Sequence, residues 1–266
     1  MLPNTARLRQ EEASSIHIEA SLYGGQVTIQ RGDFGKQKHA YYWKEKGLFI
    51  PGATSILGIL DKPALIQWAA NKAVEHVVAN LQEGASKADI KRVCEEAKGR
   101  HVRIKEEAGE IGSNVHELAH KLFSGQPILV PEDKPTQNGL TGIMDWIKSN
   151  DIQPIDIERV AFSKSAFFAG TFDLLAAVNG KLSLIDLKTS AFVYIEHKLQ
   201  LGGYKFAWEE EFRGDRINQL IILHLDKKTG KMKPHIYDDH NEMQHFTNTF
   251  LKVNQAASAL KQIRDY

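Results

Sequence analysis

Cysteine is almost absent from this chain, which has one, Cys94, among its 266 residues. A single thiol excludes a disulfide framework within the chain, a four-cysteine zinc site and an iron–sulfur cluster held by the chain's own cysteines. The chain also lacks an apolar run of membrane-spanning length, and residues 1–12 lack the apolar segment of a signal peptide. We therefore expect a soluble, cytoplasmic protein without a membrane partner.

A strong net charge is missing as well. The chain has 34 Lys and Arg residues against 33 Asp and Glu residues, which gives a formal net charge of +1. This balance excludes the global positive charge of many nucleic-acid-binding proteins, although a local basic groove is compatible with a neutral chain. The composition, 42% hydrophobic and 25% charged, is typical of a globular protein, and the length allows one large domain or a core with a helical insertion.

The hydrophobic pattern predicts both helices and strands. After a polar, frayed start over residues 1–15, alternating residues predict a small antiparallel meander. Its strands are expected at residues 26–30, 39–43 and 48–50. One helix is expected to begin near residue 63, and further helices are expected over residues 104–123, 139–149, 195–212 and 242–263. Further strands are expected over residues 155–162, 174–178, 182–185, 216–225 and 232–237. A helix, three strands, a helix and a strand in this order predict an α+β or mixed α/β core.

The most informative segment is residues 170–188. Asn179-Gly180 stands between two apolar runs and is the strongest short-range signal for a tight hairpin, which brings Asp186 back towards Asp173. Two carboxylates held together repel each other unless a cation lies between them, and oxygen ligands of this kind suit Mg²⁺ or Mn²⁺. Because residues i and i+2 of a strand point to the same face, Lys188 is expected to point where Asp186 points.

Two helices add further polar residues. The helix expected over residues 104–123 carries His116, a candidate metal ligand, and His120, which we interpret as structural. Gly109 lies inside that helix at a cost of roughly 1 kcal/mol relative to alanine, which suggests a close backbone approach. On the helix expected over residues 195–212, Gln200 and Tyr204 are at i and i+4 and therefore share one face.

These features occur together in one order along the chain. The motifs are Gly112-Ser113-Asn114-Val115-His116-Glu117, Gly170-Thr171-Phe172-Asp173, Asp186-Leu187-Lys188 and Gln200-Leu201-Gly202-Gly203-Tyr204. In this combination the chain resembles the PD-(D/E)XK nuclease superfamily, in the RecB-like branch with a QxxxY motif. That branch includes phage exonucleases and the mitochondrial genome maintenance exonuclease.

The resemblance implies a restriction-endonuclease-like fold. We expect a mixed central sheet flanked by helices, with an N-terminal β-meander and a helical lead-in. The implied division is an N-terminal extension and meander at residues 1–55 and a nuclease domain at residues 56–266. Within that domain, a helical subdomain is expected over about residues 56–150 and a catalytic core over about residues 103–237.

The resemblance also implies an activity, that of a metal-dependent DNA exonuclease acting on single strands or ends in phage or bacterial recombination and repair. The implied metal ligands, for Mg²⁺ or Mn²⁺, are His116, Asp173, Asp186 and the carbonyl of Leu187. Lys188 would orient or deprotonate the attacking water and stabilise the developing charge. Gln200 would hold the strand by hydrogen bonds, and Tyr204 by a hydrogen bond or by stacking on a base. Glu158 is a weaker candidate for the metal's outer shell.

Each motif alone is weak evidence, because an Asp-x-Lys sequence is usually just a charged strand end. Three other functions stay open. One is an endonuclease or an RNA-directed nuclease of the same fold. Another is a catalytically inactive nucleic-acid-binding subunit, although no motif residue has been lost. The last is a small-molecule metal hydrolase, against which the Gln-x-x-x-Tyr helix argues. The sequence predicts neither the polarity of digestion nor the oligomeric state.

Overall fold

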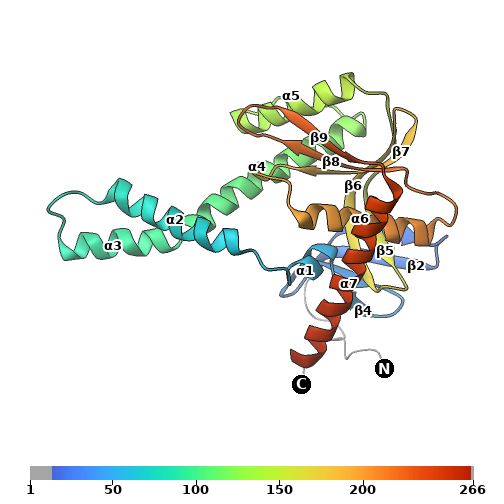
Figure 1. Ribbon diagram of the computed structural model, residues 1–266, viewed down its shortest axis with the longest axis horizontal. Coiled ribbons are helices and arrows are strands. Elements are labelled where there is room, and N and C mark those ends of the chain that lie inside the picture. The colour runs from blue at the N-terminus through green and yellow to red at the C-terminus, as the bar shows by residue number, and fades with distance from the viewer. Residues whose placement is uncertain (1–13, 265–266) are drawn as a thin grey trace. The chain divides into compact units, whose positions relative to one another are not determined.

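The computed structural model describes residues 14–264 (Figure 1). It divides into two compact units, one made of the residues up to Ile59 and from Leu118 onward, the other of Leu60–Glu117. Most of the segment expected to be frayed lies outside the described residues, and a strand begins at Ser14. Among residues 14–264, no helix has both the length and the apolar character that crossing a bilayer requires.

An antiparallel sheet opens the first unit. Its strands, in spatial order, are β1 (Ser14–Leu22), β2 (Val27–Phe34), β3 (Gln37–Trp43) and β4 (Leu48–Ile50). The last three confirm the predicted meander, and β1 adds an edge strand that was not predicted. Leu22, Ile29 and Tyr41 are buried in one apolar cluster with Phe162 of the second sheet. The meander is therefore part of the hydrophobic core of this unit.

The second sheet is mixed, as predicted. Its strands, in spatial order, are β5 (Ile152–Ser163), β6 (Phe168–Val178), β7 (Lys181–Lys188), β8 (Gln219–Leu225) and β9 (Met232–Tyr237). Only β7 and β8 pair in parallel within this sheet. A parallel pair needs a crossover connection, and a helix between the two strands provides it. β8 is buried along almost its whole length, as expected for a strand covered on both faces.

Helices cover this sheet. Those of the first unit are α1 (Ala53–Leu57), α5 (Lys134–Lys148), α6 (Ile195–Glu211) and α7 (His240–Arg264), together with the end of α4 (Arg100–Phe123). α6 is the crossover between β7 and β8, and Figure 1 shows α5 and α6 on opposite sides of β8 and β9. Asn138 of α5 donates hydrogen bonds to the carbonyls of Lys227 and Lys228, at 3.0 and 2.7 Å, which attaches α5 to the β8–β9 turn. This arrangement of helices and strands confirms the predicted fold class.

Two glycines let α6 and α7 approach closely. A Cβ at Gly202 would lie 2.6 Å from the backbone carbonyl carbon of Phe246 and 2.6 Å from the nitrogen of Thr247. A Cβ at Gly203 would lie 2.8 Å from the ring of Phe250. Thr247 also donates a hydrogen bond from Oγ1 to the carbonyl of Gly202, at 3.1 Å. The glycines inside the Gln-x-x-x-Tyr motif therefore position α6 by contact with α7.

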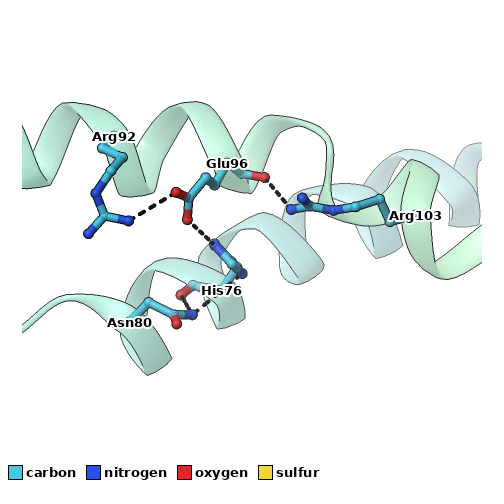
Figure 2. A network of polar contacts seen from close by, with 5 residues as sticks. All are labelled: His76, Asn80, Arg92, Glu96 and Arg103. Carbon is cyan, nitrogen blue, oxygen red and sulfur yellow. Dashed lines mark hydrogen bonds and ion pairs between the residues drawn. The ribbon is translucent and has the colours of Figure 1, made fainter.

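The second unit is helical. It contains α2 (Pro63–Asn80), α3 (Lys87–Lys98) and most of α4 (Arg100–Phe123). Figure 2 shows a polar network inside it, centred on Glu96 of α3. The Glu96 carboxylate lies 2.9 Å from Arg92 Nη1 and 3.6 Å from His76 Nε2, and the Glu96 carbonyl accepts a hydrogen bond from Arg103 at 3.0 Å. The network links the three helices, although pairs exposed to this degree contribute little each. The domain boundaries expected from the sequence stay predictions.

Candidate active site

The predicted hairpin is present, and it places Asp173 and Asp186 on neighbouring strands. The β6–β7 register pairs Leu174 with Ile185, so the two aspartates follow directly beyond this pair at the same end of the hairpin. The turn residues Asn179 and Gly180 have φ values of +49° and +79°. Positive φ at both central residues is what a type I′ turn requires, and this explains why the Asn-Gly pair predicted the hairpin correctly.

Both carboxylates have defined partners. Asp173 accepts a hydrogen bond at Oδ2 from the backbone N–H of Leu187, with a donor–acceptor distance of 2.6 Å. Asp186 is only 2% exposed and forms an ion pair with Lys188. Asp186 and Lys188 are separated by one residue on β7, so their side chains share a face, as predicted. A carboxylate this deeply buried is costly unless a cation lies beside it, and Lys188 supplies that charge.

The charge of Lys188 depends on both aspartates. Burial acts to lower the pKa of Lys188 because it disfavours the charged ammonium, but the negative charges of Asp186 and Asp173 outweigh burial and raise this pKa above its ordinary value. Lys188 is therefore a cation at neutral pH. Its attraction to Asp173 as well as Asp186 shows that the three side chains form one electrostatic cluster.

Gln200 and Tyr204 form a hydrogen-bonded pair on α6. Gln200 Nε2 donates to the hydroxyl of Tyr204 at 2.7 Å. Tyr204 is 2% exposed, and burial raises its pKa well above the ordinary value, with Asp186 and Asp173 acting in the same direction. Its hydroxyl therefore stays protonated near the two carboxylates. Stacking on a base, which the sequence left open for Tyr204, does not fit a ring that is buried in the protein.

Gly170 connects the hairpin to this pair. A Cβ at Gly170 would lie 2.2 Å from Cε1 and 3.0 Å from Cζ of Tyr204. Carbon atoms in van der Waals contact are about 3.5–4.0 Å apart, so only glycine leaves room for the ring. The Gly-x-x-Asp and Gln-x-x-x-Tyr motifs are therefore in direct contact, with Gly170 against the tyrosine whose hydroxyl orients Gln200.

Two further residues, which were not predicted to belong to the site, contact the motifs. Thr54 of α1 accepts a longer hydrogen bond from Gln200 Nε2, at 3.4 Å. The hydroxyl of Tyr41, on β3, lies 3.0 Å from Oγ1 of Thr171 inside the Gly-x-x-Asp motif. These residues come from the meander and from the short helix that follows it. No spacing relates them to the motifs, so only the fold could reveal them.

The other residues that the sequence suggested for the site have fewer defined contacts with the motifs. His116 lies on α4 in the helical unit, and its role as a metal ligand stays a prediction. A Cβ at Gly109 would meet no atom within 4 Å among the described residues, so the close approach suggested for this glycine is not made to them. On β5, the register places Glu158 opposite Asp173, and its φ of +48° is uncommon for a residue other than glycine.

The side chains present suit a hard divalent cation. Asp173 and Asp186 bring two carboxylates to one end of the hairpin, and the Leu187 carbonyl belongs to the same strand segment. Mg²⁺ binds oxygen ligands and usually takes only one or two protein carboxylates, while Mn²⁺ accepts carboxylate, carbonyl and imidazole ligands. This set of donors therefore fits the predicted Mg²⁺ or Mn²⁺.

The part of the chain that contains the candidate active site matches a known protein family. Residues 143–265 match the family model described as "PD-(D/E)XK nuclease superfamily". The matched residues include both aspartates, Lys188 and the Gln200–Tyr204 pair but not His116. The predicted resemblance is thereby confirmed, and with it the enzyme class, a metal-dependent nuclease. The search of curated proteins found no match.

Several solved structures also resemble the chain at low identity. An alkaline exonuclease from Laribacter hongkongensis is 12% identical, with 75% of this chain and 98% of that chain covered and a TM-score of 0.29. A phage-related exonuclease from Haemophilus somnus 129PT is 15% identical, with 72% and 94% covered and a TM-score of 0.28. A protein named SSO0001 is 12% identical, with 74% and 86% covered and a TM-score of 0.33. Similarities this weak add no argument about function.

Proposed function

We propose that this protein is an exonuclease that hydrolyses the phosphodiester bonds of DNA, from single strands or from ends. The observation that carries the proposal is the cluster of Asp173, Asp186 and Lys188 beside the hydrogen-bonded Gln200–Tyr204 pair. Two carboxylates and one ammonium suit a reaction in which a divalent cation and a lysine together face an anionic phosphate. A role in phage or bacterial recombination and repair rests on the order of the motifs alone.

The roles of the metal ligands follow from their chemistry. Asp173 and Asp186 would hold Mg²⁺ or Mn²⁺, with the Leu187 carbonyl and His116 as further ligands. When bound, such an ion polarises the scissile phosphate and lowers the pKa of the attacking water. The hydrogen bond from the Leu187 N–H fixes the Asp173 carboxylate, so this ligand is oriented before any ion binds.

Lys188 and Gln200 would act on the substrate itself. Lys188, held protonated by the two carboxylates, donates hydrogen bonds to the attacking water or to the phosphate and offsets the negative charge that develops there. Gln200 would hold the strand by hydrogen bonds to phosphate. Tyr204 is a positioning residue in this proposal, because its buried hydroxyl accepts the hydrogen bond that orients Gln200.

The experiment compares substrates that differ in their ends and in their sugar. Purified protein is incubated with linear single-stranded and double-stranded DNA labelled at either end, with covalently closed circular single-stranded DNA, and with RNA of the same sequence. Each substrate is tested with Mg²⁺, with Mn²⁺ and with EDTA. We expect metal-dependent digestion of linear DNA and an intact circle, and the label that is released first gives the polarity.

Each alternative function that involves a nucleic acid has its own outcome in this assay. Cleavage of the circle at a similar rate indicates an endonuclease, and cleavage of the RNA alone indicates an RNA-directed nuclease. DNA that is bound but stays intact with both metals contradicts the catalytic proposal and supports a binding subunit of the same fold.

A further inference from the structure

A second group of metal-ligating side chains lies in the N-terminal sheet, among residues that the active site does not use. His17 of β1, Asp33 of β2 and His39 of β3 each offer one ligand atom, and these atoms all lie within 4.8 Å of one another. His17 Nε2 is 3.9 Å from Asp33 Oδ1. We propose that these three residues, the His17–Asp33–His39 site, bind a divalent transition metal, with Zn²⁺ as the best match.

Irregular strand pairing brings the three side chains together. The β1–β2 register shifts once between Ile16 and Ile18, at His17, and the β2–β3 register shifts once between Gly32 and Phe34, at Asp33. A β-bulge redirects the side chain of its extra residue, and here two irregularities adjoin on neighbouring strands. Lys38 and His39 both lie opposite Asp33 in the interrupted β2–β3 register, and His39 has a φ of +51°. The site therefore takes one residue from each of three adjacent strands, at the level where the regular pleat is interrupted.

The ligand types select the class of metal. Two imidazoles and one carboxylate, with a water in the fourth position, form a zinc coordination set found in proteins, whereas Mg²⁺ and Ca²⁺ favour oxygen ligands. This site would therefore bind a softer metal than the carboxylate pair of the active site does. Asp33 Oδ1 already accepts the backbone N–H of His39 at 2.9 Å, and a carboxylate oxygen retains a second lone pair for a metal.

The ligand atoms, which all lie within 4.8 Å of one another, must approach by up to about 1.4 Å to bind one zinc ion. Ligand atoms at about 2.0–2.1 Å from a tetrahedral zinc ion are about 3.3–3.4 Å apart. The separation of 3.9 Å between His17 and Asp33 exceeds this value by about 0.5 Å. Both imidazoles are exposed, so side-chain rotation can close the gap.

One cation already competes for the carboxylate. Lys38 Nζ lies 3.3 Å from Asp33 Oδ2. The Lys38 side chain is 66% exposed, and ion pairs of this kind contribute little free energy because water screens them. A metal with two imidazole ligands would therefore displace Lys38 or share the carboxylate with it.

A metal at this site would join β1, the edge strand, to β2 and β3. The same sheet packs through Leu22, Ile29 and Tyr41 against Phe162 of the catalytic sheet. The expected effect of the metal is therefore to stabilise the fold, and the inference does not depend on the proposed nuclease activity.

Equilibrium dialysis of the full chain against Zn²⁺, in excess Mg²⁺ to occupy the active-site carboxylates, counts the zinc ions bound. We expect His17→Ala and Asp33→Asn each to bind one zinc fewer per chain than the wild type. His245→Ala removes an exposed histidine of α7 and should bind as much zinc as the wild type. Asp33→Asn preserves the size of the side chain, and circular dichroism checks the fold of every variant.

Two further readouts make the outcome decisive. Zn²⁺ should raise the melting temperature of the wild type and of His245→Ala, and should raise that of His17→Ala less. Co²⁺ in place of Zn²⁺ should give a visible absorption band that His17→Ala lacks. Equal zinc binding by the wild type, His17→Ala and Asp33→Asn would overturn the proposal, as would an equal loss in His245→Ala.

Discussion

Replacing Gly170 by alanine tests the contact between the two motifs. The new Cβ would lie 2.2 Å from Cε1 and 3.0 Å from Cζ of Tyr204, whereas carbon atoms in contact are about 3.5–4.0 Å apart. The ring or the strand must therefore move by more than about 1 Å. Tyr204 is 2% exposed, so the ring has no open space to enter. Overpacking of this kind costs about 1–3 kcal/mol of folding free energy.

The same displacement should reduce activity. Tyr204 accepts a hydrogen bond from Gln200 at 2.7 Å, and a shift of about 1 Å breaks this alignment. A misplacement of that size lowers a catalytic rate by up to about 100-fold. Urea denaturation measures the loss of stability. The initial rate of DNA digestion, under conditions where the variant is fully folded, measures the loss of activity.

Gly99→Ala is the matched control. Gly99 has an ordinary negative φ of −90°, and a Cβ there would meet no described atom within 4 Å. Its stability and activity should stay close to those of the wild type. A Tyr204→Phe background should not relieve the cost of Gly170→Ala, because the clash is with ring carbons. Wild-type stability and activity in Gly170→Ala would refute the packing of Tyr204 against Gly170.

Three further substitutions test the supporting structure. Gly202→Ala should cost about 1–3 kcal/mol in urea denaturation, because the new Cβ meets backbone atoms of α7 that cannot rotate away; an unchanged midpoint contradicts the close packing of the two helices. Asp133→Ala should cost about 1 kcal/mol near neutral pH, because Asp133 caps α5 by accepting the Thr136 N–H at 2.8 Å. That bond lowers the pKa of Asp133 in the folded state. The difference in unfolding free energy between Asp133→Ala and the wild type should therefore disappear as the pH falls from about 4 through the folded-state pKa. A difference that persists at lower pH argues against the cap. Burial raises the pKa of Tyr41, so the folded state holds the phenolic proton more tightly than the unfolded state. The free energy of unfolding should therefore fall as the pH rises above about 10, and it should fall less steeply in Tyr41→Phe. Parallel curves of unfolding free energy against pH for the two proteins would contradict this prediction.

The hairpin and the order of the elements could be predicted because their signals are local. Asn179-Gly180 specifies its own turn, and the apolar runs on either side specify the strands. The missed strand β1 had a signal too, since Ile16, Ile18, Ala20 and Leu22 alternate with polar residues. The predicted meander began at residue 26 and therefore did not include them.

The contacts around the site could not be predicted from local patterns. Tyr204 meets Gly170 because α6 docks on the sheet, and Gly202 fixes α6 against α7 through residues far along the chain. Tyr41 reaches Thr171 from 130 residues away. Such contacts depend on how whole elements pack, and no spacing within one element encodes them.

The central claim is that the carboxylate pair and Lys188 form a metal-dependent nuclease centre. The most direct test measures the rate of linear DNA digestion in Mg²⁺ by Lys188→Met and by Lys181→Met, which removes an exposed lysine of the same strand. We predict a loss of at least about 100-fold for Lys188→Met, the size expected when a group that stabilises transition-state charge is removed, and an almost unchanged rate for Lys181→Met. A folded Lys188→Met that digests DNA at the wild-type rate would contradict the account.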